Sequence, residues 1–193
     1  MRTNKRIEKI KTVLENRQPT LHLVMENIHD PHNVSAILRT CDAVGVDSVS
    51  LLYHIEKFPK IGKKSSASAG KWVKREKYTS VEVCFNSLKK ANYKIYSSYI
   101  GKGTKNLFDL DLSEKVALVM GNEHRGISEE VIKNSDELFF IPMYGMVQSL
   151  NVSVATAISL YEAMRQRMRS GLYGKTSLTE EEFNNRLEEW ITK

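Results

Sequence analysis

The polar residues best placed to do chemistry lie in the segment IPMYGMVQSLNVSVATAISLYEA, residues 141–163. The segment is apolar enough to be buried, but Gln148, Ser149 and Asn151 interrupt it where the chain turns. A buried polar group without a partner costs about 1–3 kcal/mol. Either other protein groups or a ligand must therefore satisfy these side chains.

A second polar loop, GNEHRG at residues 121–126, follows the apolar run 116–120. It lacks the G-x-G start of a dinucleotide-binding fingerprint and the Gly-Lys-Ser/Thr of a phosphate-binding loop. The chain also has no G-x-S-x-G motif, so Ser149 is a poor candidate for a hydrolase nucleophile. What remains is a pair of glycine-containing loops, each placed directly after a strand-like run.

Metal chemistry finds little support in the sequence. His29 and His32 are three residues apart but have no third ligand nearby, and Cys41 and Cys84 match no zinc spacing. We therefore expect no metal site, and we interpret the two cysteines as reduced thiols of a cytoplasmic protein.

Arg39 is the remaining candidate for chemistry. It falls on the face of a predicted helix opposite to an apolar stripe at residues 34, 37, 38 and 41. Taken alone, this position is typical of a surface arginine. Asn33, at the start of the same helix, is in turn typical of a helix cap.

Basic residues gather in three places on a chain with a net charge of +6 and a pI near 9.2. The places are residues 2–17, residues 57–77 and the three arginines Arg165, Arg167 and Arg169. The middle of the second, IGKKSSASAGKW, is typical of a mobile loop. Any one cluster alone is as well explained by solvated surface, but three together favour RNA or DNA as a partner.

Strands alternate with helices around these motifs. The patterns predict strands at residues 21–26, 48–53, 93–99, 116–120 and 138–141, and helices at residues 5–16, 31–44, 81–91, 128–134 and 179–192. Residues 150–160 alternate like a strand, but they continue without a turn into the strong helix former YEAMRQRMR, so we predict a helix. The result is an α/β fold with a mainly parallel sheet. No apolar run reaches the ~18 residues that cross a membrane.

Three segments resemble, in order and spacing, the motifs of the SPOUT RNA methyltransferases. They are NVSAILRTCDAVG (33–45), LVMGNEHRGIS (118–128) and IPMYGMVQSLNVSVA (141–155). The similarity covers residues 5–174 and is strongest to the TrmH branch, the tRNA guanosine-18 2′-O-methyltransferases. GMVQSLN followed by RQR is typical of the branch that acts on tRNA.

The resemblance implies a single SPOUT domain over residues 1–174, with a C-terminal deep trefoil knot, and a tail helix within residues 175–193. It implies S-adenosyl-L-methionine as cofactor, a homodimer, and no membrane or metal. The residues implied to bind the cofactor are Ser98, Gly121, Ile141 and Leu150. Those implied to act in methyl transfer are Arg39, Glu123, Ser149 and Asn151, with Arg39 supplied by the other subunit.

For RNA binding the expected residues are Arg6, Lys63, Lys64, Lys71 and Arg165. The run SSASAGKW departs from the Gly-rich, His-containing run of many tRNA-branch members. Substrates therefore stay open between guanosine 18 of the tRNA D-loop, the tRNA wobble ribose and rRNA. A non-catalytic RNA-binding protein of the same fold is the remoter alternative, although the four transfer residues are intact.

Overall fold

A parallel β-sheet forms the centre of the computed structural model, which describes residues 4–59 and 69–193. Within these residues seven strands pair in the order β3-β2-β1-β6-β4-β7-β5, and every pair is parallel. The strands are β1 (Leu21–Glu26), β2 (Ser48–Leu52), β3 (Lys74–Tyr78), β4 (Lys94–Ser98), β5 (Lys105–Asn106), β6 (Val116–Met120) and β7 (Glu137–Phe140). The predicted α/β class with a mainly parallel sheet is thereby confirmed.

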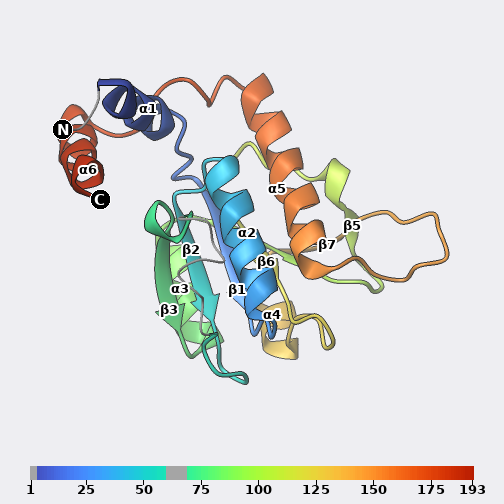
Figure 1. The fold of residues 1–193 in the computed structure, drawn as a ribbon. Helices are drawn as coiled ribbons and strands as arrows, with labels where there is room; N and C mark the ends of the chain where they lie inside the picture. Colours follow the sequence, from blue (N-terminus) through green and yellow to red (C-terminus); the bar gives the residue numbers. More distant parts are fainter. Residues whose placement is uncertain (1–3, 60–68) are drawn as a thin grey trace.

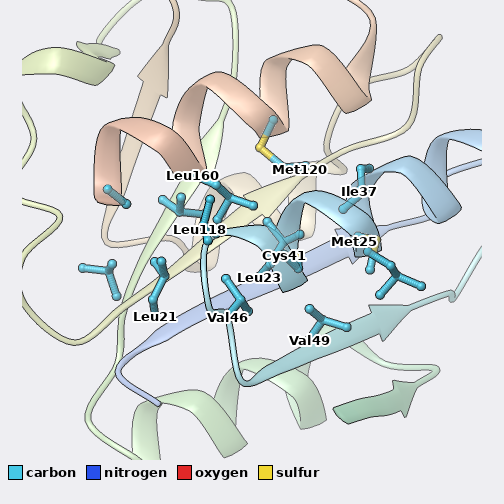
Figure 2. Packing of buried hydrophobic residues seen from close by; sticks show 14 of the residues in the cluster. Leu21, Leu23, Met25, Ile37, Cys41, Val46, Val49, Leu118, Met120 and Leu160 are labelled. Atoms are coloured by element: carbon cyan, nitrogen blue, oxygen red, sulfur yellow. The ribbon is translucent and has the colours of Figure 1, made fainter. Parts of the chain in front are cut away.

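Helices cover both faces of the sheet (Figure 1). α2 (Pro31–Ala43) and α5 (Val152–Arg169) pack on one face, and α3 (Val81–Lys90) and α4 (Glu129–Asn134) pack on the other. Figure 2 shows the first of these interfaces, in which Leu23 of β1 and Leu118 of β6 lie beneath Cys41 of α2 and Leu160 of α5. A sheet covered on both faces needs strands that are apolar throughout, which explains the run VALVM of β6.

The helical interpretation of residues 150–160 is confirmed from Val152 onward, because α5 begins there, after its cap Asn151, and runs without interruption to Arg169. Two strands were not predicted. β3 overlaps the basic segment 57–77, and its four consecutive charged residues match an edge strand whose side chains are largely exposed. β5 has two residues, too few to carry a period.

Two further helices pack together at the end of the sheet where the strands begin (Figure 1). They are α1 (Asn4–Glu15) and α6 (Glu180–Thr192), and Trp190 of α6 is buried against Ile10 and Leu14 of α1. The division into a domain of residues 1–174 and a tail of residues 175–193 stays a prediction, as does the knotted path of the C-terminal part.

None of the helices in the described ranges is long and apolar enough to span a bilayer. Both cysteines are buried as free thiols, and burial is the main reason that the pKa of Cys84 rises to about 12. A thiol held this far from ionisation is inert, so neither cysteine belongs to the site described below.

Candidate active site

A cavity of about 350 Å³ opens where three neighbouring strands end, β6, β4 and β7. In an open α/β sheet, ligands bind at the carboxyl ends of strands. The four residues expected to bind the cofactor all line this cavity: Ser98, Gly121, Ile141 and Leu150. Glu123 and Ser149, two of the four expected transfer residues, line it as well.

The loop after β6 forms one wall of the cavity and is closed tightly on itself. The backbones of Asn122 and Gly126 exchange two hydrogen bonds of 3.0 and 2.9 Å. A Cβ atom added to Gly121 would lie 2.3 Å from the carbonyl carbon of Gly126. Glycine is therefore required at position 121 by the close approach of backbone, whatever ligand the cavity receives.

The two ends of the segment 141–150 form the opposite wall, through Ile141 and Met143 at one end and Ser149 and Leu150 at the other. Within the described residues, no backbone hydrogen bond involves positions 141–150, although Ile141 and Leu150 are half-buried against the cavity. Backbone groups near a cavity need partners, which a ligand with its own donors and acceptors can supply. Apolar side chains beside them, including Met120 and Val152, suit a ligand with both polar and apolar parts.

The prediction that the polar residues of this segment are buried is wrong for the single chain. Gln148, Ser149 and Asn151 are exposed, and Tyr144 and Met146 are 98% and 100% exposed. The reason is that residues 141–151 form an extended loop with only its two ends against the sheet.

A chain of hydrogen bonds joins the three motif segments beside the cavity. Asn33 donates from Nδ2 to Oε1 of Glu123 over 2.8 Å, and its Oδ1 accepts from Nδ2 of Asn151 over 3.1 Å. Asn151 caps α5 by accepting from the backbone N–H of Ser153 at 2.8 Å. Motif residues that are 118 positions apart are thus held in one arrangement.

The interpretation of Asn33 as a helix cap is wrong. Asp30 caps α2 by accepting from the backbone N–H of His32, and Pro31 occupies the first helical position. The signal was present in the sequence, because Asp-Pro already provides a complete helix start. Asn33 was thereby free for another task, and it is the site residue that sequence reasoning missed.

The carboxylate of Glu123 is held in its ionised form. Partial burial alone would raise its pKa, but hydrogen bonds from Asn33 and from the backbone N–H groups of His29 and Asp30 outweigh this and lower the pKa. Glu123 is therefore an anchor that accepts hydrogen bonds at neutral pH, and it has no proton to give.

Arg39 lies on the exposed face of α2 and does not line the cavity of its own chain. Among the described residues it has neither a hydrogen-bond partner nor an ion-pair partner. Its expected place at the mouth of the other subunit's cavity stays a prediction.

The expected RNA-binding residues have different surroundings. Arg6 on α1 and Lys71 at the end of η1 (Ala69–Lys71) are exposed, whereas Arg165 binds Glu162 through two bonds of 2.8 and 2.7 Å. Lys63 and Lys64 lie outside the described residues. All five assignments stay predictions.

Arg167 does not belong to an exposed basic cluster. It is fully buried, and it donates to the carbonyl oxygens of Leu112, Thr20 and Glu114. The expectation that it contributes to RNA binding is wrong, because its long side chain reaches across the start of the sheet and away from solvent.

In residues 4–59 and 69–193, no three His, Cys, Asp or Glu side chains are grouped to hold a metal ion. The polar groups around the cavity are backbone amides, hydroxyl groups and the side chains of Asn122, Glu123, His124 and Arg125, a mixed set that suits an organic ligand.

The chain is similar to a known protein family and to several of its members. Residues 20–161 match the model of the SpoU rRNA Methylase family. The chain is 42% identical to a tRNA (guanosine(18)-2′-O)-methyltransferase of Aquifex aeolicus, over 96% of this chain and 88% of the relative. It is 40% identical to the enzyme of the same name from Thermus thermophilus, over 100% and 98% of the two chains.

Two solved structures are similar as well. A TrmH/SpoU tRNA modifying enzyme of A. aeolicus superposes with a TM-score of 0.91 at 40% identity, covering 97% of this chain and 95% of that one. An AdoMet-bound rRNA methyltransferase from Sinorhizobium meliloti superposes with a TM-score of 0.65 at 25% identity, covering 80% and 59%.

Proposed function

Since this chain belongs to the SpoU rRNA Methylase family, we propose that it transfers a methyl group from S-adenosyl-L-methionine to the 2′-OH of guanosine 18 in tRNA. The observation that supports this substrate is the similarity to two tRNA (guanosine(18)-2′-O)-methyltransferases. Each match extends over most of this chain and most of the relative. No feature of this chain favours rRNA or the tRNA wobble ribose over guanosine 18 as the substrate.

The cavity at the ends of β4, β6 and β7 fits the cofactor. Unpaired backbone groups of residues 141–150 suit the adenine and the amino-acid part, and the walls at Met120 and Val152 suit the less polar part. When bound, S-adenosyl-L-methionine supplies an electrophilic methyl group on a sulfonium centre.

The residues of the chain then have to orient the ribose. Transfer requires the 2′-oxygen in line with the methyl, and positioning of this kind lowers barriers by about 7–11 kcal/mol in favourable cases. The Asn33–Glu123–Asn151 chain fixes the three motif loops relative to one another, which keeps the mouth of the cavity in shape. Ser149, on the cavity wall, is placed to contact the substrate.

Arg39 has the remaining task of orienting the 2′-OH or assisting the loss of its proton. A guanidinium has a pKa above ~12 and is a poor base. Its unpaired charge is available to the RNA, because no acidic side chain in the described ranges binds it.

A homodimer is part of this proposal, because Arg39 does not reach the cavity of its own chain. The support is a stripe of exposed apolar residues on α5, Val154, Tyr161 and Met168, spaced seven residues apart. Together with the exposed Tyr144 and Met146, such a surface indicates a protein partner. Light scattering at micromolar concentration should show twice the 22.1 kDa of one chain, and a monomer alone would reject the dimer.

The decisive experiment is to methylate an unmodified tRNA transcript and to map the product by digestion and mass spectrometry. We expect one methyl on the ribose of guanosine 18, and none on a transcript with 2′-deoxyguanosine at that position. A methyl on a base, on the wobble ribose or only on rRNA fragments would contradict the substrate. RNA binding without any transfer would favour the non-catalytic alternative.

A further inference from the structure

Two cavities flank a pair of tryptophans at the amino end of the sheet, away from the methyl-transfer site. The rings of Trp72 and Trp190 are tilted by 52°, with their centroids 5.0 Å apart. A cavity of about 380 Å³ lies between this pair and α1, and one of about 310 Å³ lies between the pair and β3. Trp190 is 5% exposed, whereas Trp72 is half-buried and lines both cavities.

The first cavity has an apolar interior and a basic rim. Ile10 and Val13 of α1 face the two tryptophans across it, and Arg6 and Lys9 stand on the same helix. Neither of these two cations has an ion-pair partner among the described residues. The rim is therefore open to negative charge from outside.

Acidic residues around both cavities are already neutralised. Asp42 binds Arg17 at 2.5 Å, and Asp47 binds Arg186 at 2.5 Å. Glu189 binds Lys193 at 2.8 Å. A polyanion can therefore bind the cations of this surface, because the nearby carboxylates are already paired.

The floor beneath the tryptophans is preformed. The guanidinium of Arg17 lies 5.1 Å from the ring centroid of Trp190, and its Nη1 donates to the carbonyl oxygen of Val46 at 2.9 Å. Holding an aromatic platform in place before binding reduces the entropy lost on binding.

We propose that the cavity between α1 and Trp72 is a second RNA-binding site, which takes one unstacked nucleotide of the substrate. Its base lies against Trp72, and its phosphates contact Arg6 and Lys9. Aromatic rings next to cations are the usual means of holding unpaired nucleotides without reading their sequence. Because the ligand is RNA, this inference rests on the proposed function.

The location gives the site a distinct role. β1 begins close to α1, whereas the methyl-transfer cavity lies at the ends of β4, β6 and β7 (Figure 1). A nucleotide bound at Trp72 is therefore remote from the methyl-transfer cavity of the same chain and is a different nucleotide from the one that is methylated there. Changes here should alter RNA affinity and KM while leaving kcat and cofactor affinity unchanged.

The chain reports on this site directly, because Trp72 and Trp190 are its two tryptophans. Titration of the full-length protein with an unmodified tRNA transcript should quench intrinsic tryptophan fluorescence, since a base stacked on an indole quenches its emission. Trp190→Phe isolates Trp72 and should keep the quenching. Trp72→Leu isolates Trp190 and should lose most of it.

Affinity for tRNA tests the same platform. Trp72→Leu removes the aromatic face but keeps apolar volume, and it should weaken tRNA binding by about 5- to 100-fold. Trp72→Phe should recover much of this loss. Phe108→Leu, which changes an aromatic residue that is 51% exposed at the other edge of the sheet, serves as the control.

The phosphate contact is tested by a matched pair on α1. Lys9→Gln should make the log–log salt dependence of tRNA binding shallower by about 0.7–0.9. Lys11→Gln removes the same charge from the same helix, but Lys11 does not line the cavity and is paired with Glu8. It should leave the slope unchanged.

Unchanged fluorescence together with unchanged tRNA affinity of Trp72→Leu would overturn the site. A 100-fold loss of cofactor affinity in the same variant would also reject it, since that outcome indicates a general structural role. A wrong substrate assignment would give a different set of results. A methyl on another nucleotide would reject guanosine 18, while quenching by tRNA and the Lys9 effect would still support the second site.

Discussion

The two ends of the sheet differ in whether their backbone polar groups have hydrogen-bond partners. At the amino end, the buried guanidinium of Arg167 satisfies the carbonyl oxygens of Leu112, Thr20 and Glu114. At the carboxyl end, the backbone of residues 141–150 lacks hydrogen-bond partners within the described part of the chain. At the first end the chain itself satisfies the buried carbonyl oxygens, whereas at the second end the backbone groups stay open to a ligand.

This difference indicates how one sheet separates stability from cofactor binding and methyl transfer. Changes at the sealed end should affect the free energy of unfolding and spare cofactor binding. Changes around the open end should affect methyl transfer at a smaller cost in stability. The four predictions below test that separation, beginning with the largest effect.

Arg39→Ala should lower kcat for methyl transfer by about 10³-fold, because the variant lacks the group that orients or activates the 2′-OH. Affinity for S-adenosylhomocysteine should be unchanged, since the proposed place of Arg39 is at the mouth of the partner's cavity, on the side of the RNA. Single-turnover kinetics and calorimetry measure the two quantities. Arg169→Ala, another exposed arginine, is the control. Equal loss of both properties would mean that Arg39 has only a structural role.

Arg167→Met should lower the free energy of unfolding by about 3 kcal/mol, because it leaves several buried carbonyl oxygens without a donor. Urea denaturation at a fixed protein concentration measures this change, and Arg169→Met provides an exposed control on the same helix. Cofactor affinity of the folded variant should stay normal. A stable variant that no longer binds cofactor would show that the two ends are not separate.

His22→Gln should remove an acid-sensitive part of stability. Burial lowers the pKa of His22 from 6.5 to about 4, and the attraction of Glu76 and Asp47 offsets this only in part. The unfolded chain therefore binds a proton more readily, and stability falls as pH drops from above 6.5 toward 4.

Between pH 7 and pH 5 this one group should cost the native protein about 2 kcal/mol. Gln keeps hydrogen bonding to Ser48 and Ser50 but does not titrate in this range. Urea denaturation at the two pH values should therefore show a weaker pH dependence in the variant. The exposed His32→Gln is the comparison, and an identical change in both variants would count against the assignment.

Asn33→Ala should have the smallest effect on stability, about 1 kcal/mol, and should slow methyl transfer about tenfold. The variant removes the bond that helps to keep Glu123 ionised, so the pKa of Glu123 should rise. Activity should then be lost at a higher pH on acidification than in the parent protein. Asn134→Ala is the control, because its side chain donates only to the carbonyl oxygen of Glu130. An unshifted acidic limb would contradict the link between Asn33 and Glu123.

Hydrophobic pattern was sufficient to predict most elements of the fold. β1 and β6 were located to the residue, because buried parallel strands are rich in apolar residues; β6 is apolar throughout, and β1 is apolar except at His22 and Glu26. β3 was missed because it lies at the edge of the sheet and carries charges, so that no apolar pattern marks it. Side chains of an edge strand are the least buried in the sheet, so the hydrophobic pattern is weakest there.

Motif spacing located the candidate site as well, since the four expected cofactor residues line one cavity. The partners of single polar residues were less predictable. Asn33 was interpreted as a cap and Arg167 as surface, because a residue type does not reveal which distant groups surround it. Asn33 meets Glu123 across 90 positions, and Arg167 meets Thr20 across 147.

By itself the sequence determined the α/β class, the family and the motifs that form the cavity. Only the tertiary structure decided which polar groups are sealed inside and which stay open to a ligand. It also brought Trp72 and Trp190 together from opposite parts of the chain. The physical reason is that local pattern reports burial, whereas hydrogen-bond and ring partners depend on how distant strands and helices pack.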